Sequence, residues 1–169
     1  MTDDADRAGW AVLVAASAGA LLCFLNLSAL NVALPAVARS LHASPTQASW
    51  ILLSYMLVST VCILSFGRLA DLWGRRRLFL SGLWLFVAAC AACAFAPTAE
   101  LMLASRTGQA IGAAGVMANA SALVSDAFGR RRMGLALGVL AMVAALAQVV
   151  GPLAGPRPKR HAISVIDSR

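Results

Sequence analysis

Five long apolar segments divide this chain, and each has about the length, ~20 residues, that a helix needs to cross the hydrocarbon core of a bilayer. Polar residues and prolines separate the segments. We therefore expect an all-α fold, a multi-pass transmembrane helical bundle of about five spans over residues 10–155, between an amino-terminal segment 1–9 and a basic tail 156–169. The expected spans are residues 10–34, 48–66, 78–96, 101–124 and 133–154.

The balance of residue types favours a membrane protein. Hydrophobic residues make up 60% of the sequence and charged residues only 12%, whereas about a quarter of the residues in a soluble domain are charged. The net charge of +7 could indicate a nucleic-acid partner, but the arginines form short clusters between long apolar segments, so no continuous basic face arises. We expect the lipid bilayer as a partner and no nucleic acid.

Arginine is distributed unevenly between the two sides of the expected bundle. It is frequent between spans two and three (Arg68, Arg75, Arg76 and Arg77) and between spans four and five (Arg130, Arg131 and Arg132). The alternate connections hold only Arg39. Because basic residues gather on the cytoplasmic side of a membrane, we expect a cell-membrane protein whose amino terminus and arginine-rich connections are cytoplasmic.

Few side chains could support catalysis or hold a metal. Cys90 and Cys93 have the C-x-x-C spacing of some redox and metal pairs, but no histidine, aspartate or basic residue accompanies them. We interpret all four cysteines as small apolar filler, and both histidines, His42 and His161, are isolated. No nucleophile–base pair, metal cluster or phosphate loop appears, so we expect neither an enzyme nor a cofactor. The other cysteines are Cys23 and Cys62.

Glycines recur at four-residue spacing in the last two spans. Small residues at that spacing let helix backbones approach closely in lipid, although glycine and alanine are also simply common in such helices. Because three pairs occur in two adjacent spans, we favour close packing. The pairs are Gly108 with Gly112, Gly134 with Gly138, and Gly151 with Gly155.

Residues 67–77, between spans two and three, combine glycine, aspartate and arginine. Gly67 and Gly74 permit a tight, closely approached turn. Asp71 is a single acid among arginines and can pair with them or with a helix amino terminus. An ordinary basic loop would explain the arginines, but it would not explain the spacing of the glycines and the aspartate.

The same segment resembles the signature loop of the major facilitator superfamily, which lies at this place between spans two and three. The resemblance extends over most of the chain and is to the amino-terminal portion of fourteen-span drug:proton antiporters. In that family the loop is thought to latch the two halves of the transporter together in one of its alternating states. The resemblance assigns this role to Asp71, with Arg75 and Arg76 in support, and Gly67 and Gly74 complete the pattern.

The first span carries three polar residues within residues 25–35, a stretch that resembles the first-span motif of these antiporters. The family usually has aspartate where Asn26 stands and threonine where Ser28 stands. An amide cannot take up and release a proton, so Asn26 departs from the proton-coupling pattern. Two interpretations of Asn26, Ser28 and Asn31 remain open: hydrogen bonds between helices, or a lining for substrate and protons.

In the fourth span, residues 103–112 are similar to a family motif whose arginine and glutamine are associated with proton transfer. Arg106 lies about 8 Å below the outer end of the expected helix. It could extend to the interface, but membrane arginines usually have a partner or a function. Arg106, Gln109, Gly112 and Asn119 fall within an arc of about 140° on one helix face. A polar stripe on one face favours a cavity lining.

Residues 151–155 of the fifth span resemble the glycine–proline motif typical of antiporters in the superfamily. Proline removes one backbone hydrogen bond and the glycines allow bending, so Gly151, Pro152 and Gly155 predict a weak point in the helix. The family pattern departs at Pro156, where a basic, proline-rich tail begins. Five spans would place this tail outside, against the positive-inside bias, and we therefore expect a truncated or frameshifted copy.

The sequence leaves two functions open. The first is proton-coupled efflux of a small hydrophobic or cationic substrate, which such folds bind near the membrane midplane between two structural repeats. A five-span chain would need a partner chain that supplies the missing spans. The second is a non-transporting membrane remnant or a fragment that acts only by packing against other helices.

Overall fold

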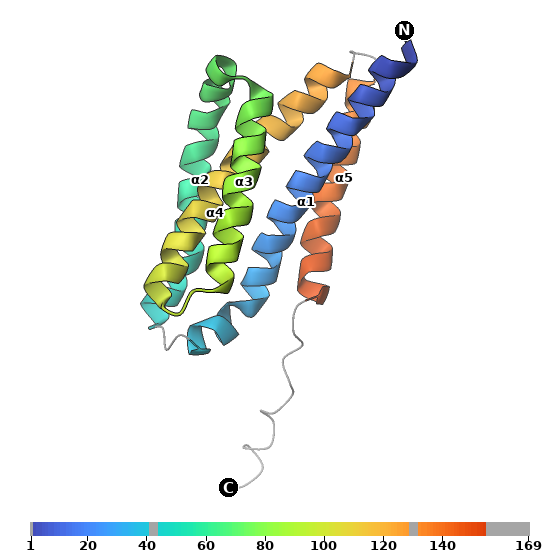
Figure 1. Cartoon of the computed structure of the whole chain (residues 1–169). Helices are drawn as coiled ribbons and strands as arrows, with labels where there is room; N and C mark the ends of the chain where they lie inside the picture. Colours follow the sequence, from blue (N-terminus) through green and yellow to red (C-terminus); the bar gives the residue numbers. More distant parts are fainter. Residues whose placement is uncertain (1, 41–43, 129–131, 155–169) are drawn as a thin grey trace, which may run out of the picture.

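The computed structural model describes residues 2–40, 44–128 and 132–154, and these residues form five α-helices. All five are long and apolar enough to cross a membrane, which confirms the predicted all-α, multi-pass bundle. They lie side by side along one direction (Figure 1). The helices are α1 (Thr2–Ser40), α2 (Pro45–Trp73), α3 (Arg75–Ala94), α4 (Ala99–Ala127) and α5 (Met133–Ala154).

Local sequence explains where α2 and α4 begin. The Ser44 side chain accepts a hydrogen bond from the Gln47 backbone N–H, the Gln47 side chain accepts one from the Ser44 N–H, and Pro45 occupies the first turn, where no backbone donor is needed. The Thr98 side chain accepts from the Leu101 N–H and starts α4 in the same way. Both starts lie at the end of the bundle opposite the amino terminus (Figure 1).

The connection between α2 and α3 is much shorter than the loop expected over residues 67–77. Only Gly74 interrupts the two helices, with φ of 90°, a conformation that favours glycine. Gly67 lies inside α2, and a Cβ built there would meet nothing within 4 Å, so the tight turn and close approach expected at Gly67 are wrong. Helix α2 continues because residues 68–73 are compatible with helix, and the positive φ of Gly74 ends it.

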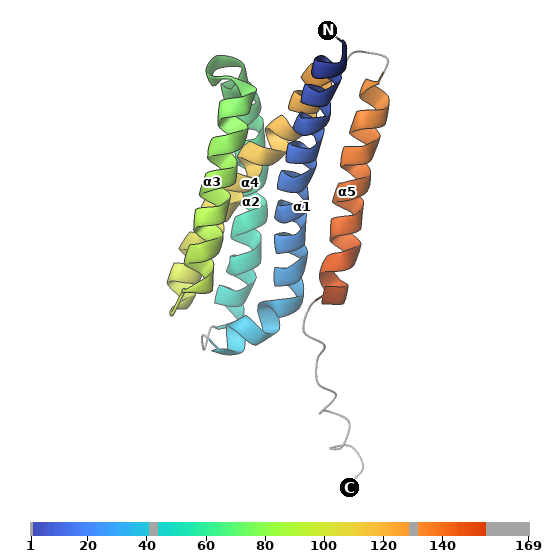
Figure 2. The same cartoon turned by 45° about the vertical axis from the view of Figure 1, so that its right-hand side comes forward.

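Helix α1 extends beyond the expected apolar span 10–34 at both ends, from Thr2 to Ser40, and Pro35 lies inside it. A proline inside a helix removes one backbone hydrogen bond and bends the helix, which need not end there. The last part of α1 bends away from the axis of the rest of the helix (Figure 2). This bend brings the chain toward the start of α2.

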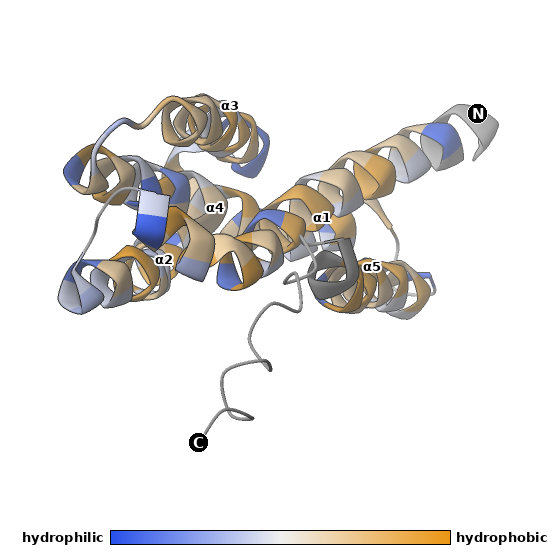
Figure 3. Cartoon of the chain, turned by 90° about the horizontal axis from the view of Figure 1, so that it is seen from below, coloured by the Kyte–Doolittle hydropathy of each residue, from blue (hydrophilic) through white to orange (hydrophobic). Residues whose placement is uncertain are grey.

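Helix α4 occupies the centre of the bundle. It packs against each of the other four helices, most extensively against α3 and α2, and α1 pairs with α5 (Figure 3). The buried side chains of α4 include small apolar residues together with polar ones. The central position of α4 therefore places its polar residues inside the protein.

Three glycines bring the backbones of α3 and α4 into direct contact. A Cβ built on Gly112 would lie 2.6 Å from the Phe86 backbone nitrogen and 2.7 Å from the Gly82 carbonyl oxygen. A Cβ on Gly82 would likewise lie 2.9 Å from the Gly112 oxygen and 3.1 Å from Gly115. Such separations exclude any side chain, so the helices meet where small residues allow it.

The other expected glycine pairs do not make this kind of contact. A Cβ on Gly108 would meet Ala89 at an ordinary 3.4 Å, and one on Gly134 or Gly138 would meet nothing within 4 Å among the described residues. The prediction of close packing through Gly134 and Gly138 is therefore wrong in this bundle, because their side of α5 faces no other described helix. Gly155, of the third pair, lies outside the described residues.

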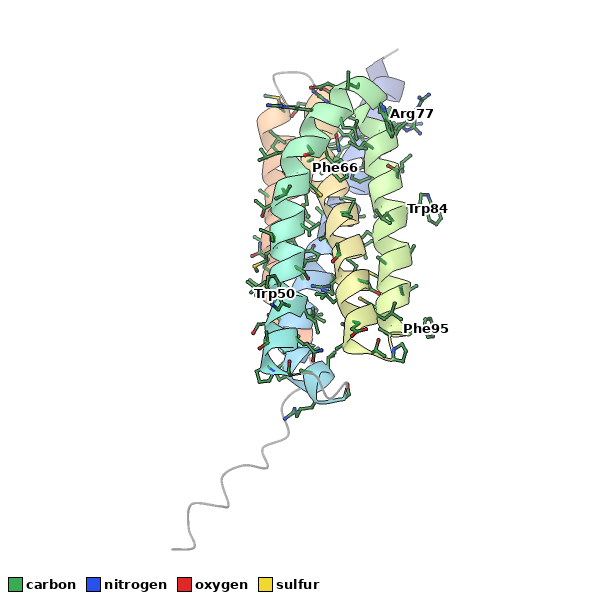
Figure 4. The ribbon with its side chains drawn as sticks, turned by 90° about the vertical axis from the view of Figure 1, so that its left-hand side faces the viewer. Trp50, Phe66, Arg77, Trp84 and Phe95 are labelled. Atoms are coloured by element: carbon green, nitrogen blue, oxygen red, sulfur yellow. The ribbon has the colours of Figure 1, made fainter. Side chains whose placement is uncertain are left out.

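Large apolar side chains cover the outside of the bundle. Trp84 is 74% exposed and Phe95 is 84% exposed, and both point away from the helices (Figure 4). Leu64 on α2 is similarly open. Apolar surface of this extent suits contact with lipid tails or with further helices.

The glycine contact generates a test. Replacing Gly112 by alanine should destabilise the bundle by about 1–3 kcal/mol, since the new methyl group collides with backbone atoms that cannot move independently. Thermal unfolding in detergent micelles would measure the change. Gly134→Ala is the matched control, because that position is open, and it should leave stability unchanged or slightly raised. Equal losses in both variants would contradict the role of the α3–α4 contact.

Candidate functional site

Arg106 lies inside the bundle and does not extend to the membrane interface. Its side chain is 1% exposed, and it is among the largest fully buried side chains of the protein. Gln109, one turn further along α4, is buried to the same degree. The charged group is therefore held within the protein by neighbouring helices.

A hydrogen-bond network surrounds one nitrogen of this guanidinium. Arg106 Nη1 donates to Asn26 Oδ1 of α1 at 3.0 Å and also to Gln109 Oε1. The two amide nitrogens both donate to one acceptor, Cys90 Sγ of α3, at 3.5 Å from Asn26 Nδ2 and 3.3 Å from Gln109 Nε2. Cys90 thus orients both amides so that their oxygens face the arginine. The network joins α1, α3 and α4.

An aromatic ring completes the surroundings of Arg106. The Tyr55 ring of α2 lies with its centroid 4.6 Å from Arg106 Cζ, a cation–π arrangement. The remaining donors of the guanidinium, Nε and Nη2, are buried and have no hydrogen-bond partner among the described residues. Every group that contacts the charge in this network is uncharged in its ordinary state: two amides and an aromatic ring.

The other predicted polar residues are divided between two places. Ser28 Oγ donates to the Gln148 backbone oxygen of α5 at 3.3 Å, and Ser28 and Asn31 line a recess of about 270 Å³ between α1 and α5. Asn119 Nδ2 donates to the Gly115 oxygen of its own helix at 2.8 Å, and its Oδ1 is buried without a partner among the described residues. The structure therefore brings Asn26, Arg106 and Gln109 together and leaves Ser28, Asn31 and Asn119 elsewhere.

A second cluster lies at the α2–α3 junction. Arg75 Nη1 donates to both carboxylate oxygens of Asp126, at 2.9 and 2.8 Å, and Nη2 lies 3.5 Å from Asp71 Oδ1. These residues line an open recess of about 620 Å³ together with Gly74 and Arg76. The pairs are exposed, and such pairs typically contribute only about 0–1 kcal/mol.

Sequence reasoning missed three residues of these clusters. Asp126 was overlooked, although it is a lone acid at the end of α4, close in sequence to the arginines that follow. Tyr55, the single tyrosine of the chain, carried no pattern. Cys90 was interpreted as apolar filler, and the structure corrects this, because its sulfur accepts two hydrogen bonds.

The motif expected in the fifth span lies at the limit of the described residues. Gly151 and Pro152 belong to the last turn of α5, and Gly155 lies outside the described residues. Proline in α5 does not interrupt the helix before Ala154.

The thiol acceptor can be tested by size-matched substitution. Cys90→Val should lower stability by about 1 kcal/mol, because two amide donors lose their acceptor, whereas Cys90→Ser keeps an acceptor and should lose less. Unfolding in detergent would measure both. Cys62→Val is the control, since no side-chain hydrogen bond is described for Cys62. A Cys90→Val loss no larger than that of Cys62→Val would refute the role of the sulfur.

Comparison with known proteins gives a consistent result. A family model described as Major Facilitator Superfamily matches residues 16–157. The chain is 33% identical over 146 residues to the riboflavin transporter RibZ of Clostridioides difficile, covering 86% of this chain and 32% of that protein. It is 37% identical over 144 residues to the multidrug resistance protein Stp of Mycobacterium tuberculosis, covering 85% and 27%.

A third relative is the lincomycin resistance protein of Streptomyces lincolnensis, 36% identical over 119 residues, with 70% of this chain and 25% of that protein covered. The chain thus spans about a third or less of the length of the curated relatives that it matches.

Proposed function

The chain belongs to the Major Facilitator Superfamily, and from this we propose that it is the amino-terminal portion of a proton-coupled exporter of small hydrophobic compounds. It is a multi-pass membrane protein, and its family is one of transporters rather than enzymes. In the proposed mechanism the protein alternates between states open to either side of the bilayer, with the substrate bound near the midplane.

The observation that carries this proposal is the buried Arg106 network. A charge within a membrane span costs about 2.5–3.5 kcal/mol on insertion scales, so a retained arginine is a functional residue by default. Asn26 and Gln109, from two different helices, hold Arg106 in place by hydrogen bonds. Its side chain is therefore positioned inside the bundle and does not extend to the membrane interface. We place it in the substrate and proton pathway, with Ser28, Asn31 and Asn119 as further polar positions along α1 and α4.

The names of two relatives support export of small compounds. One is called a multidrug resistance protein and the other a lincomycin resistance protein. A third is called a riboflavin transporter. Because Asn26 cannot titrate, we place proton uptake on other spans of the complete transporter.

The α2–α3 junction is proposed as the conformational latch. Arg75 connects Asp71 to Asp126 and so ties this junction to the end of α4. An exposed ion pair is weak enough to break in each cycle. We propose that Gly74 allows the sharp junction and that Arg76 forms an ion pair with a carboxylate of the second half of the transporter. We also propose that α5 bends at Gly151 and Pro152.

The orientation and the missing spans are also proposals. The amino terminus and the α2–α3 junction lie at the same end of the bundle, and we place this arginine-rich end in the cytoplasm (Figure 1). A substrate site between two repeats requires helices beyond these five. We propose that they come from a partner chain or from further spans of the same transporter.

Efflux of the uncharged fluorescent dye Nile red tests the proposal. The chain would be produced alone and also as a chimera in which residues 16–157 replace the matching part of the Stp relative. We expect the chimera to export the dye, an uncoupler to abolish export, and Arg106→Ala or Asp71→Asn to reduce it at least tenfold. Membrane insertion is checked for each variant, and Gly134→Ala, at an open position, serves as the control.

Two results would contradict the proposal. An inserted chimera that exports no dye would indicate that these helices do not support transport and act only by packing. Export that persists in an Arg106→Ala chimera would remove the buried arginine from the pathway. Export by the chain alone would require an oligomer of the chain to supply the remaining helices, and cross-linking would detect that oligomer.

A further inference from the structure

The charge of Arg106 has no negative partner among the residues that the structure describes. Nη1 donates to the amide oxygens of Asn26 and Gln109, and the Tyr55 ring covers one face of the guanidinium. None of these groups is an anion. Nε and Nη2 are buried, and no described residue accepts a hydrogen bond from them.

None of the acidic residues that the structure describes contacts this charge, and the nearest along a helix axis is solvent-exposed. Among the described residues, Glu100 is exposed and about 9 Å from Arg106 along the axis of α4, and Asp126 is about 30 Å away along it. Asp71 pairs with Arg75 at the same end as Asp126. The remaining acids are Asp3, Asp4 and Asp6, about 30 Å or more along α1 from Asn26, and Asp167, outside the described residues.

The geometry points to a ligand of specific chemistry. We infer that the Nε–Nη2 edge of Arg106 binds the carboxylate of a small organic anion, so that the site selects anionic substrates over cationic ones. The two N–H groups on this edge are parallel and match the two oxygens of a carboxylate. The inference rests on the proposed function and deepens it by naming the charge of the substrate. Of the hydrophobic or cationic substrates expected from the sequence, it rejects the cationic ones.

The electrostatic field of Arg106 favours anionic over cationic substrates even when the substrate does not touch the guanidinium. A buried cation with unmatched donors is costly, and an anion that pairs with it relieves that cost. A cationic ligand about 10 Å away would instead be repelled, by roughly tenfold in affinity at an effective dielectric constant of ~20. The field in this part of the bundle thus favours anions even before the carboxylate reaches the guanidinium.

Asn26 is the residue that leaves the Nε–Nη2 edge without a hydrogen-bond partner. Cys90 accepts from its amide nitrogen and turns its oxygen toward Nη1, on the other side of the guanidinium from Nε. An aspartate at this position would carry its own negative charge to Arg106. The amide contributes a hydrogen bond but no charge, and the cation remains uncompensated.

Tyr55 provides a reporter for this site. It is the single tyrosine of the chain, is 6% exposed and stacks on the guanidinium. Both unpaired nitrogens are closed off in this structure, so a carboxylate reaches them only when the groups that cover them move. Incorporated 3-fluorotyrosine gives one ¹⁹F resonance, which should respond to any ligand that reaches Arg106.

The experiment titrates the labelled chain in lipid nanodiscs with sodium benzoate and, separately, with benzamide at constant ionic strength. Benzamide has the same ring and nearly the same shape but no charge. We expect a saturable ¹⁹F shift with benzoate and at least tenfold weaker response to benzamide. The scaffold protein around the nanodisc is the same in both titrations and no partner transporter chain is present, so a saturable benzoate response assigns the anion to a small solute and not to an acidic side chain of a partner.

Three variants separate charge from shape. Arg106→Lys keeps the charge but removes the parallel edge, and it should weaken the benzoate response at least tenfold. Asn26→Asp should weaken it similarly, because its own carboxylate neutralises the guanidinium. Asn26→Ser changes the same position without adding charge and should keep the response.

Equal responses to benzoate and benzamide, or no response to benzoate, would overturn the inference. So would an Asn26→Asp variant that binds benzoate as well as the Asn26→Ser variant does. The measurement requires no transport. A benzoate response in a chain whose chimera exports no Nile red would therefore reject the proposed export and leave the anion site standing.

Discussion

The direct contact between the backbones of α3 and α4 determines where everything else in the bundle lies. Gly82 and Gly112 leave no room for a side chain between the two helices, and a Cβ on Gly115 would lie a tight 3.2 Å from Gly82 Cα. This close contact fixes the register of the helices as well as their distance. Cys90 follows Gly82 on α3, and Gln109 precedes Gly112 on α4, so this register brings the thiol within hydrogen-bond reach of the amide. The position of Arg106 follows from the same contact.

Helix α4 can carry polar residues because the other helices shield it. Arg106, Gln109 and Asn119 are buried against neighbours, whereas large apolar side chains such as Trp84 and Phe95 face outward. In lipid no hydrophobic effect draws helices together, and association relies on close packing and on hydrogen bonds between helices. The glycine contact is close packing between α3 and α4, and the Arg106 network is a set of hydrogen bonds that links these two helices to α1.

The sequence predicted the features that are determined within a single helix. Apolar length predicted the five spans, and helical spacing placed Arg106 and Gln109 on one buried face. The sequence did not predict that Asn26 contacts Arg106, 80 residues away, or that the Tyr55 ring lies against the guanidinium. Contacts between helices depend on how the helices are aligned with one another, which no single segment determines. The interpretation of Cys90 as apolar filler is wrong because the amide donors of Asn26 and Gln109 reach its sulfur only in the folded bundle, and the sequence does not show this contact. The prediction for Gly134 and Gly138 is wrong because a local pattern of small residues allows close packing but does not determine whether another helix lies against them.

The identity of residue 26 links substrate charge to energy coupling. An aspartate there, as the resembling antiporters usually have, would both neutralise Arg106 and offer a group that can take up a proton. Asparagine does neither, although it makes the same hydrogen bond to Nη1 at 3.0 Å. A site with an internal carboxylate can exchange a proton for a cation, because protonation and cation binding compete for one negative charge. A site with an amide has a fixed positive charge, and only an anion from outside can balance it. The placement of proton uptake on other spans and the inferred preference for anions, both proposals, therefore have one physical cause.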